Sequence, residues 1–251
     1  MKEAAISYYQ EESRKLFDEW KTASGLVEYM TKREVKTLHI DHKNSVFIKD
    51  GVVCPDMWFS YDVRPLFLLK EAYGGKEDWD LIQDYLTEDQ AINKIWKRIS
   101  EWTKGLLETT ADHIAPYTAD DLAASRFNNQ YLQRIAVINI KKSDGNKTSD
   151  MDLIRAYAAF DNDKLRKQLE LCDPTIIICG YTASALDQIT GRKVREPQND
   201  NLFYHIVLNG HDVLVLDYWH PANYYPDIMN YYGLMGIYQQ SLLAGTKRPT
   251  A

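Results

Sequence analysis

Short apolar runs alternate with longer amphipathic segments along most of the chain. Four runs lack the two-residue alternation of a half-exposed strand, which is typical of strands buried on both faces of a parallel sheet. They cover residues 65–69, 134–140, 174–179 and 212–217. Segments with helical spacing separate them, so the pattern predicts an α/β fold, a three-layer αβα sandwich with a central, mostly parallel four-stranded sheet.

The first 60 residues predict an extension of this sheet domain. Residues 2–30 carry apolar side chains at helical spacing, which indicates a pair of N-terminal helices. Residues 45–48 and 52–54 flank Asp50 and Gly51, a dipeptide suited to a tight turn, and so predict a small β-hairpin.

Helical segments fill most of the remaining chain. The spacing predicts helices over 76–107 and 119–130, which together make a helical insertion at about 80–130, and a helical pair over 149–172. Residues 203–208 predict a strand antiparallel to the fourth core strand. Neither a linker nor an internal repeat is visible, so we expect residues 1–251 to form a single domain.

Composition narrows the class of protein. A hydrophobic content of 45% is sufficient for a substantial core, and no window approaches the roughly 18 apolar residues that a membrane span requires. With a polar N-terminus, this predicts a cytoplasmic protein with no membrane partner, which we expect to be a monomer. The net charge of −6 argues against nonspecific affinity for nucleic acid, although a local basic patch can override it.

The three cysteines are widely spaced. Cys54, Cys172 and Cys179 form no CxxC pair and no even-numbered disulfide framework. We therefore predict reduced cysteines, no metal and no cofactor.

Polar residues and glycines follow each predicted core strand. In parallel α/β sheets, ligands bind at the carboxyl ends of the strands. The segments at these ends are 70–78, 139–142, 180–183 and 218–223. The sequence therefore predicts a site at this edge of the sheet.

Four motifs in these segments resemble those of the uracil-DNA glycosylase superfamily, in the same order. The first is similar to GEAPGxxED of its iron–sulfur branch and is matched by Glu71, Ala72, Gly74, Glu77 and Asp78. The second is similar to NxxK with a Gly-Asn turn and is matched by Asn139, Lys142 and residues 145–147. The third is similar to a helix, strand and GxTA turn at 165–183, and the fourth to HPA at 220–222. The resemblance covers about residues 65–225 and implies that superfamily's fold.

The resemblance implies hydrolysis of the N-glycosidic bond of a deaminated or modified base in DNA. The departing base carries negative charge, and His220 would donate a hydrogen bond to the oxygen where it develops. Asn139 would read the Watson–Crick edge of the flipped base. Glu71 would support the cationic sugar or orient water, and the backbone at Gly74 would approach the substrate closely.

Further residues are expected to contact the substrate or the DNA. Tyr73, Glu77 and Asn223 would also contact the substrate. The expected DNA contacts are Lys142, Lys147, Tyr224 and Tyr225.

The chain also departs from the superfamily pattern. Ala72 stands where the most active members carry an aspartate, Tyr73 replaces a proline, and Lys70 replaces a glycine. The three cysteines cannot supply the four ligands of an iron–sulfur cluster. The motifs do not locate the aromatic residue that would stack on the base, and Tyr73, Trp79 and Tyr85 are all candidates for this role.

Two alternatives remain at the level of sequence. The first is a catalytically weak or inactive module that binds a base or nucleotide with the same fold, favoured by Ala72 and Tyr73. The second is an ordinary nucleotide-binding α/β protein that holds phosphate at 180–183, although the glycine patterns of such sites are missing. Structural roles are also open for Asn139, as a strand cap, and for Glu71, as a solvated charge.

Overall fold

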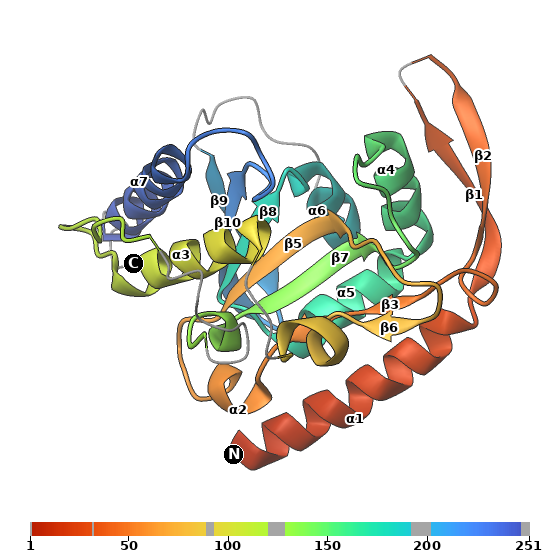
Figure 1. The fold of residues 1–251 in the computed structure, drawn as a ribbon, viewed down its shortest axis with the longest axis horizontal. Helices are drawn as coiled ribbons and strands as arrows, with labels where there is room; N and C mark the ends of the chain where they lie inside the picture. Colours follow the sequence, from red (N-terminus) through yellow and green to blue (C-terminus); the bar gives the residue numbers. More distant parts are fainter. Residues whose placement is uncertain (1, 32, 89–92, 120–128, 192–201, 247–251) are drawn as a thin grey trace.

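The computed structural model of the chain describes residues 2–31, 33–88, 93–119, 129–191 and 202–246. At its centre lies a six-stranded sheet with strand order β4-β7-β5-β8-β10-β9 (Figure 1). No helix in the described part of the chain is long and apolar enough to cross a membrane.

The four predicted core strands form the middle of this sheet. They are β5 (Pro65–Glu71), β7 (Ala136–Lys141), β8 (Ile176–Gly180) and β10 (His211–Tyr218). All neighbouring pairs among them are parallel, so the predicted parallel core is confirmed, although the sheet has six strands and not the predicted four. The edge strands β4 (Gly51–Val52) and β9 (Phe203–Leu208) run antiparallel to their neighbours, as predicted for β9.

Helices cover both faces of the sheet because successive side chains of a strand point to opposite sides. Along β5, Leu66 and Leu68 pack in one apolar cluster, and Phe67 and Leu69 in the other. The first cluster lies under α1 (Lys2–Lys21), α4 (Met151–Phe160), α5 (Asn162–Cys172) and α6 (Ala183–Thr190), and the second under α3 (Lys94–Glu108) and α7 (Asp227–Thr246). The predicted helical pair over 149–172 is confirmed by α4 and α5.

The predicted pair of N-terminal helices is wrong in its second half. After α1, the chain forms β1 (Ser24–Met30) and β2 (Val35–Asp41), an antiparallel hairpin that projects beyond α4 (Figure 1). Exposed and partly buried residues alternate along β1 with the two-residue period of a strand, and Gly25 packs against Phe160. A helical stripe does not fit this alternation.

The hairpin predicted around Asp50 and Gly51 is also wrong. Strand β3 (Ile48–Lys49) pairs in parallel with β6 (Trp79–Asp80), whereas β4 pairs with β7. The two strands diverge because the Asp50 carboxylate is buried and hydrogen-bonded inside the protein, as described below.

The helical insertion is less regular than predicted. A five-residue π-helix, η1 (Ile82–Leu86), precedes α3, and a short 3₁₀ helix, η2 (Leu132–Arg134), leads into β7. The helix predicted over 119–130 lies mainly outside the described residues. A remaining short helix, α2 (Pro55–Trp58), connects β4 to β5.

Candidate functional site

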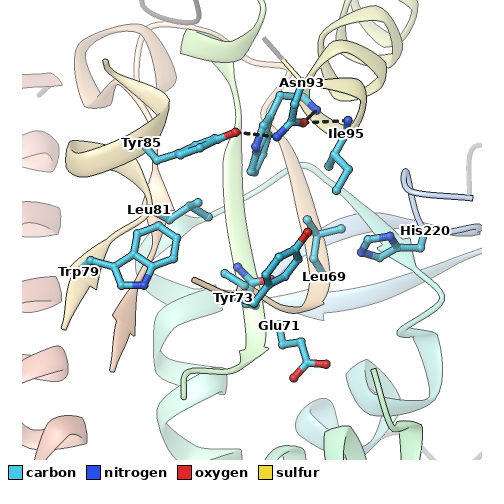
Figure 2. Close-up of a pocket in the computed structure, with 12 residues that line it drawn as sticks. Leu69, Glu71, Tyr73, Trp79, Leu81, Tyr85, Asn93, Ile95 and His220 are labelled. Carbon is cyan, nitrogen blue, oxygen red and sulfur yellow. Dashed lines mark hydrogen bonds between the residues drawn. The ribbon is translucent and has the colours of Figure 1, made fainter. Parts of the chain in front are cut away.

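A cavity of about 250 Å³ opens beside the carboxyl ends of β5 and β7 (Figure 2). Its lining comes from β5 and the loop after it, β6, η1, the start of α3, β7, and the loop after β10. The lining residues are Leu69, Glu71, Ala72, Tyr73, Trp79, Leu81, Tyr85, Asn93, Ile95, Trp96, Asn139 and His220. Four residues predicted from three separate parts of the sequence thus border one cavity, namely Glu71, Tyr73, Asn139 and His220.

His220 is held as a neutral hydrogen-bond donor. Its Nδ1 atom accepts the backbone N–H of Ala222 at 3.1 Å, which assigns the proton of the neutral ring to Nε2. Burial, together with the positive charge of Lys70, lowers the pKa of His220 to about 4. The ring therefore stays uncharged at neutral pH and offers an N–H.

Gly180, at the end of β8, leaves room for Leu69, which lies beside the imidazole in the cavity lining. A Cβ atom at this position would lie 3.4 Å from Cδ2 of His220 and 2.8 Å from Cδ2 of Leu69. The glycine of the predicted GxTA turn thus allows Leu69 to lie close to the end of β8, with the His220 ring in ordinary contact beside it.

Asn139 is oriented by a buried carboxylate that the sequence did not single out. Asp50 Oδ2 accepts both the backbone N–H of Asn139 at 2.8 Å and its side-chain amide at 3.1 Å. The other carboxylate oxygen accepts hydrogen bonds from Lys142 and from Gln168. Because the side-chain nitrogen of Asn139 faces Asp50, the Oδ1 atom of Asn139 points away from Asp50. This Oδ1 atom makes no hydrogen bond with the residues that the structure describes.

The predicted DNA contact of Lys142 is wrong. Both charged side chains of the Lys142–Asp50 ion pair have 0% exposure, so the ammonium group cannot reach a phosphate. The lysine lies inward because the partner carboxylate is itself buried beneath the sheet edge. A charged side chain enters a protein interior only with such a partner.

Glu71 borders the cavity, but its carboxylate is already engaged. Oε2 accepts a hydrogen bond from Lys141 at 2.9 Å, and only 4% of the Glu71 side chain is exposed. Figure 2 shows this carboxylate directed away from Tyr85 and Asn93. Gly145 lies directly against it, because a Cβ there would be 2.7 Å from Oε2. A substrate sugar, as the resemblance implies, would therefore meet a carboxylate whose charge is shared with Lys141.

Aromatic residues form the wall opposite His220, and two of its residues were missed from sequence. Asn93 caps α3 by accepting the N–H groups of Ile95 and Trp96, and its amide donates to the Tyr85 hydroxyl at 2.6 Å. Trp96 follows directly in the first turn of the helix. An asparagine ahead of a periodic apolar segment is the signal that could have placed this helix start at the site.

The three aromatic residues left open for base stacking all line the cavity. Tyr73 is 55% exposed at its mouth, whereas Trp79 and Tyr85 are partly buried in its wall. Their common location keeps all three as possible stacking partners.

Two other predicted substrate contacts in the first motif do not line the cavity. Gly74 has φ of +105° and donates its N–H to Asp144, which explains the glycine at this turn. Glu77 is exposed to solvent outside the cavity lining. Asp78 instead accepts hydrogen bonds from Lys21 and from the Phe47 backbone, and thereby ties the loop to α1.

Asn223 has a structural position rather than the predicted substrate contact. Its side-chain amide donates to the His220 carbonyl at 3.0 Å and to Asn230 at 2.7 Å. It therefore braces the loop that carries His220 and does not face the cavity.

The remaining predicted DNA contacts are accessible. Lys147 is exposed, Tyr224 is 100% exposed, and Tyr225 is 49% exposed. Tyr225 stacks on Trp219 with ring centroids 4.3 Å apart. The loop after His220 thus presents aromatic surface beside the site.

Within the described ranges, no group of three or more His, Cys, Asp or Glu side chains is arranged to hold a metal ion. Cys54, Cys172 and Cys179 form no disulfide with one another.

Searches against models of known protein families and against curated proteins found no match to this chain.

Proposed function

We propose that this chain hydrolyses the N-glycosidic bond of a deaminated or otherwise modified base in DNA. The observation that carries the proposal is the neutral imidazole of His220 bordering the same cavity as the oriented amide of Asn139. The ordered sequence motifs supply the reaction class.

The two residues suit the electronic demands of this reaction. As the bond to the sugar breaks, its electron pair moves to the base, and negative charge builds on a base carbonyl oxygen. A neutral N–H from His220 Nε2 stabilises that charge without having to give up a proton first. In mutants of comparable sites, loss of such a donor costs about 10²–10³ in rate.

Asn139 can recognise the base before it reacts. Its free Oδ1 atom accepts a ring N–H, and the second proton of its amide nitrogen can donate to a neighbouring carbonyl. Uracil, hypoxanthine and xanthine each present a ring N–H beside a carbonyl. The aromatic wall of Tyr85 and Trp96 provides apolar surface for such a base once it is flipped out of the helix.

A binding module without catalysis is the second candidate function, and the state of Glu71 favours it. The lysine at 2.9 Å neutralises this carboxylate, and Ala72 supplies no other. Among the described residues that line the cavity, Glu71 is the one carboxylate, so activation of water and support of the sugar cation have no carboxylate there that is independent of Lys141. We expect any hydrolysis to be slow.

Base release from oligonucleotides tests the proposal. Duplex and single-stranded substrates with one uracil, hypoxanthine or xanthine are incubated with stoichiometric protein, and abasic sites are revealed by alkaline cleavage. We expect release of at least one base and its loss in His220→Ala. His113→Ala is the matched control, because His113 is exposed and lies outside the cavity lining.

A gain-of-function variant separates the two candidates. Ala72→Asp adds the carboxylate that the superfamily resemblance implies at this position, so a slow hydrolase should become faster. If neither the wild type nor Ala72→Asp releases any base, while the wild type binds the oligonucleotides, the hydrolase proposal fails and the binding module stands.

A further inference from the structure

Arg98 is a fully buried arginine that joins the helical insertion to the loop carrying His220. It lies in α3 with 0% exposure. Its Nη1 atom donates to the carbonyl oxygens of Pro221 and Asn223, both at 2.7 Å. Its Nη2 atom donates to the Tyr225 carbonyl, and Nε donates to Asp227 at 2.6 Å.

These bonds use most of the capacity of the guanidinium group. Arginine has five N–H donors in a planar fork, and four hydrogen bonds reach one short stretch of chain, residues 221–227. Asp227, which also contacts Lys97 at 3.3 Å, supplies the opposite charge. The geometry resembles a clamp in which a rigid helix fixes three successive parts of a loop.

Stability alone gives a weak reason for a buried charge at this position. Neighbours of Arg98 in α3, such as Trp96, Ile99 and Trp102, pack in the apolar cluster. Replacing a buried ion pair by well-packed apolar residues is often neutral or stabilising. The fixed geometry of the loop is the property that an apolar side chain would not supply.

The clamp acts on the residue that sets the tautomer of His220. Pro221 and Asn223, whose carbonyls Arg98 holds, flank Ala222, and the Ala222 N–H is the donor to His220 Nδ1. A displaced Ala222 would free Nδ1, so that either ring nitrogen could carry the proton.

We propose that Arg98 is a positioning residue that keeps the proton of His220 on Nε2 by fixing the backbone around Ala222. Its effect on catalysis rests on the proposed function, but its effect on the imidazole does not. Arg98 does not line the cavity, so it acts through the loop and not on the ligand.

Nitrogen NMR of His220 tests the proposal independently of activity. In the wild type we expect the Nε2–H tautomer and a low pKa. In Arg98→Met we expect a mixture of tautomers and a pKa shifted toward that of ordinary histidine, because the freed loop admits water. Arg98→Lys retains the charge beside Asp227 but lacks the fork, so we expect an intermediate effect. The matched control is Lys97→Met, which removes the other partner of Asp227 and leaves the loop carbonyls bound.

If base release is detected, we also expect kcat of Arg98→Met to fall at least tenfold with little change in KM. Unchanged His220 tautomer and pKa in folded Arg98→Met and Arg98→Lys would overturn the proposal. Should the variants not fold, amide exchange in the wild type decides: a slowly exchanging Ala222 N–H supports the clamp, and a rapidly exchanging one refutes it. Loss of the NMR effect and absence of glycosylase activity are separate results, so each idea can fail alone.

Discussion

We expect Lys142→Met to lower the free energy of unfolding of the protein without directly changing its affinity for DNA. The substitution keeps the length of the side chain but removes a charge that has 0% exposure and pairs with Asp50, which also has 0% side-chain exposure. Asp50 would retain its hydrogen bonds from Asn139 and Gln168. Breaking a buried ion pair by removing one partner costs about 3–5 kcal/mol. Because three other hydrogen bonds to the carboxylate remain, we expect the lower end, about 3 kcal/mol.

A double variant tests the cause of this loss. D50N/K142M removes both charges, so the desolvation penalty of an unpaired carboxylate disappears. We expect it to recover at least half of the free energy of unfolding that Lys142→Met loses, which is a coupling of about 1.5 kcal/mol or more. Failure of the double variant to recover stability would show that packing, and not the unpaired charge, is responsible.

Urea unfolding followed by tryptophan fluorescence measures these free energies, and an unchanged m value shows that the comparison is valid. Lys147→Met is the control, because exposed Lys147 should stay within about 0.5 kcal/mol of the wild type. The reasoning is refuted if Lys142→Met changes stability by less than about 1 kcal/mol. A loss of DNA affinity in Lys142→Met without loss of stability would restore the phosphate contact predicted from sequence.

Three further outcomes are expected. Burial and a neighbouring lysine lower the pKa of His220 to about 4, so the rate of base release should be constant from about pH 8 to pH 5 and fall only as the ring protonates. A change of the rate near the ordinary histidine pKa would contradict this expectation. Gly145→Ala places a Cβ 2.7 Å from Cγ of Glu71 and should cost about 1–3 kcal/mol in thermal unfolding, whereas Gly236→Ala, with open space around its Cβ, should not destabilise. Tyr224→Ala, at 100% exposure, should leave stability within about 0.5 kcal/mol but weaken DNA binding in a filter or anisotropy assay; an unchanged affinity would remove this loop from the proposed DNA surface.

The apolar runs predicted the central sheet well because strands buried on both faces need continuous apolar sequence. The same reasoning gave a wrong prediction for the second half of residues 2–30. Their apolar side chains are compatible with helical spacing, and the pairing of β1 with β2 and its packing against α4 fix the two-residue period after Lys21.

The site could be predicted where a single polar side chain lies at the end of a strand and borders the cavity, as for His220 and Asn139. It was not predictable where two adjacent lysines lie at the end of the same strand. Lys141 bonds to Glu71 and Lys142 to Asp50, so neighbours in sequence serve different partners on opposite sides of β7. Their partners lie about 70 and 92 positions away along the chain, a distance that local patterns do not encode.

The Asp50 carboxylate also determines how the sheet ends. Strand β4 pairs with only two residues of β7. Past these residues, the Asn139 N–H on the outer side of β7 donates to the Asp50 carboxylate and not to the backbone carbonyl of another strand. One margin of the sheet is therefore capped against recruitment of a foreign strand. Strand-mediated self-association or aggregation of this protein should therefore not start at the β4–β7 margin.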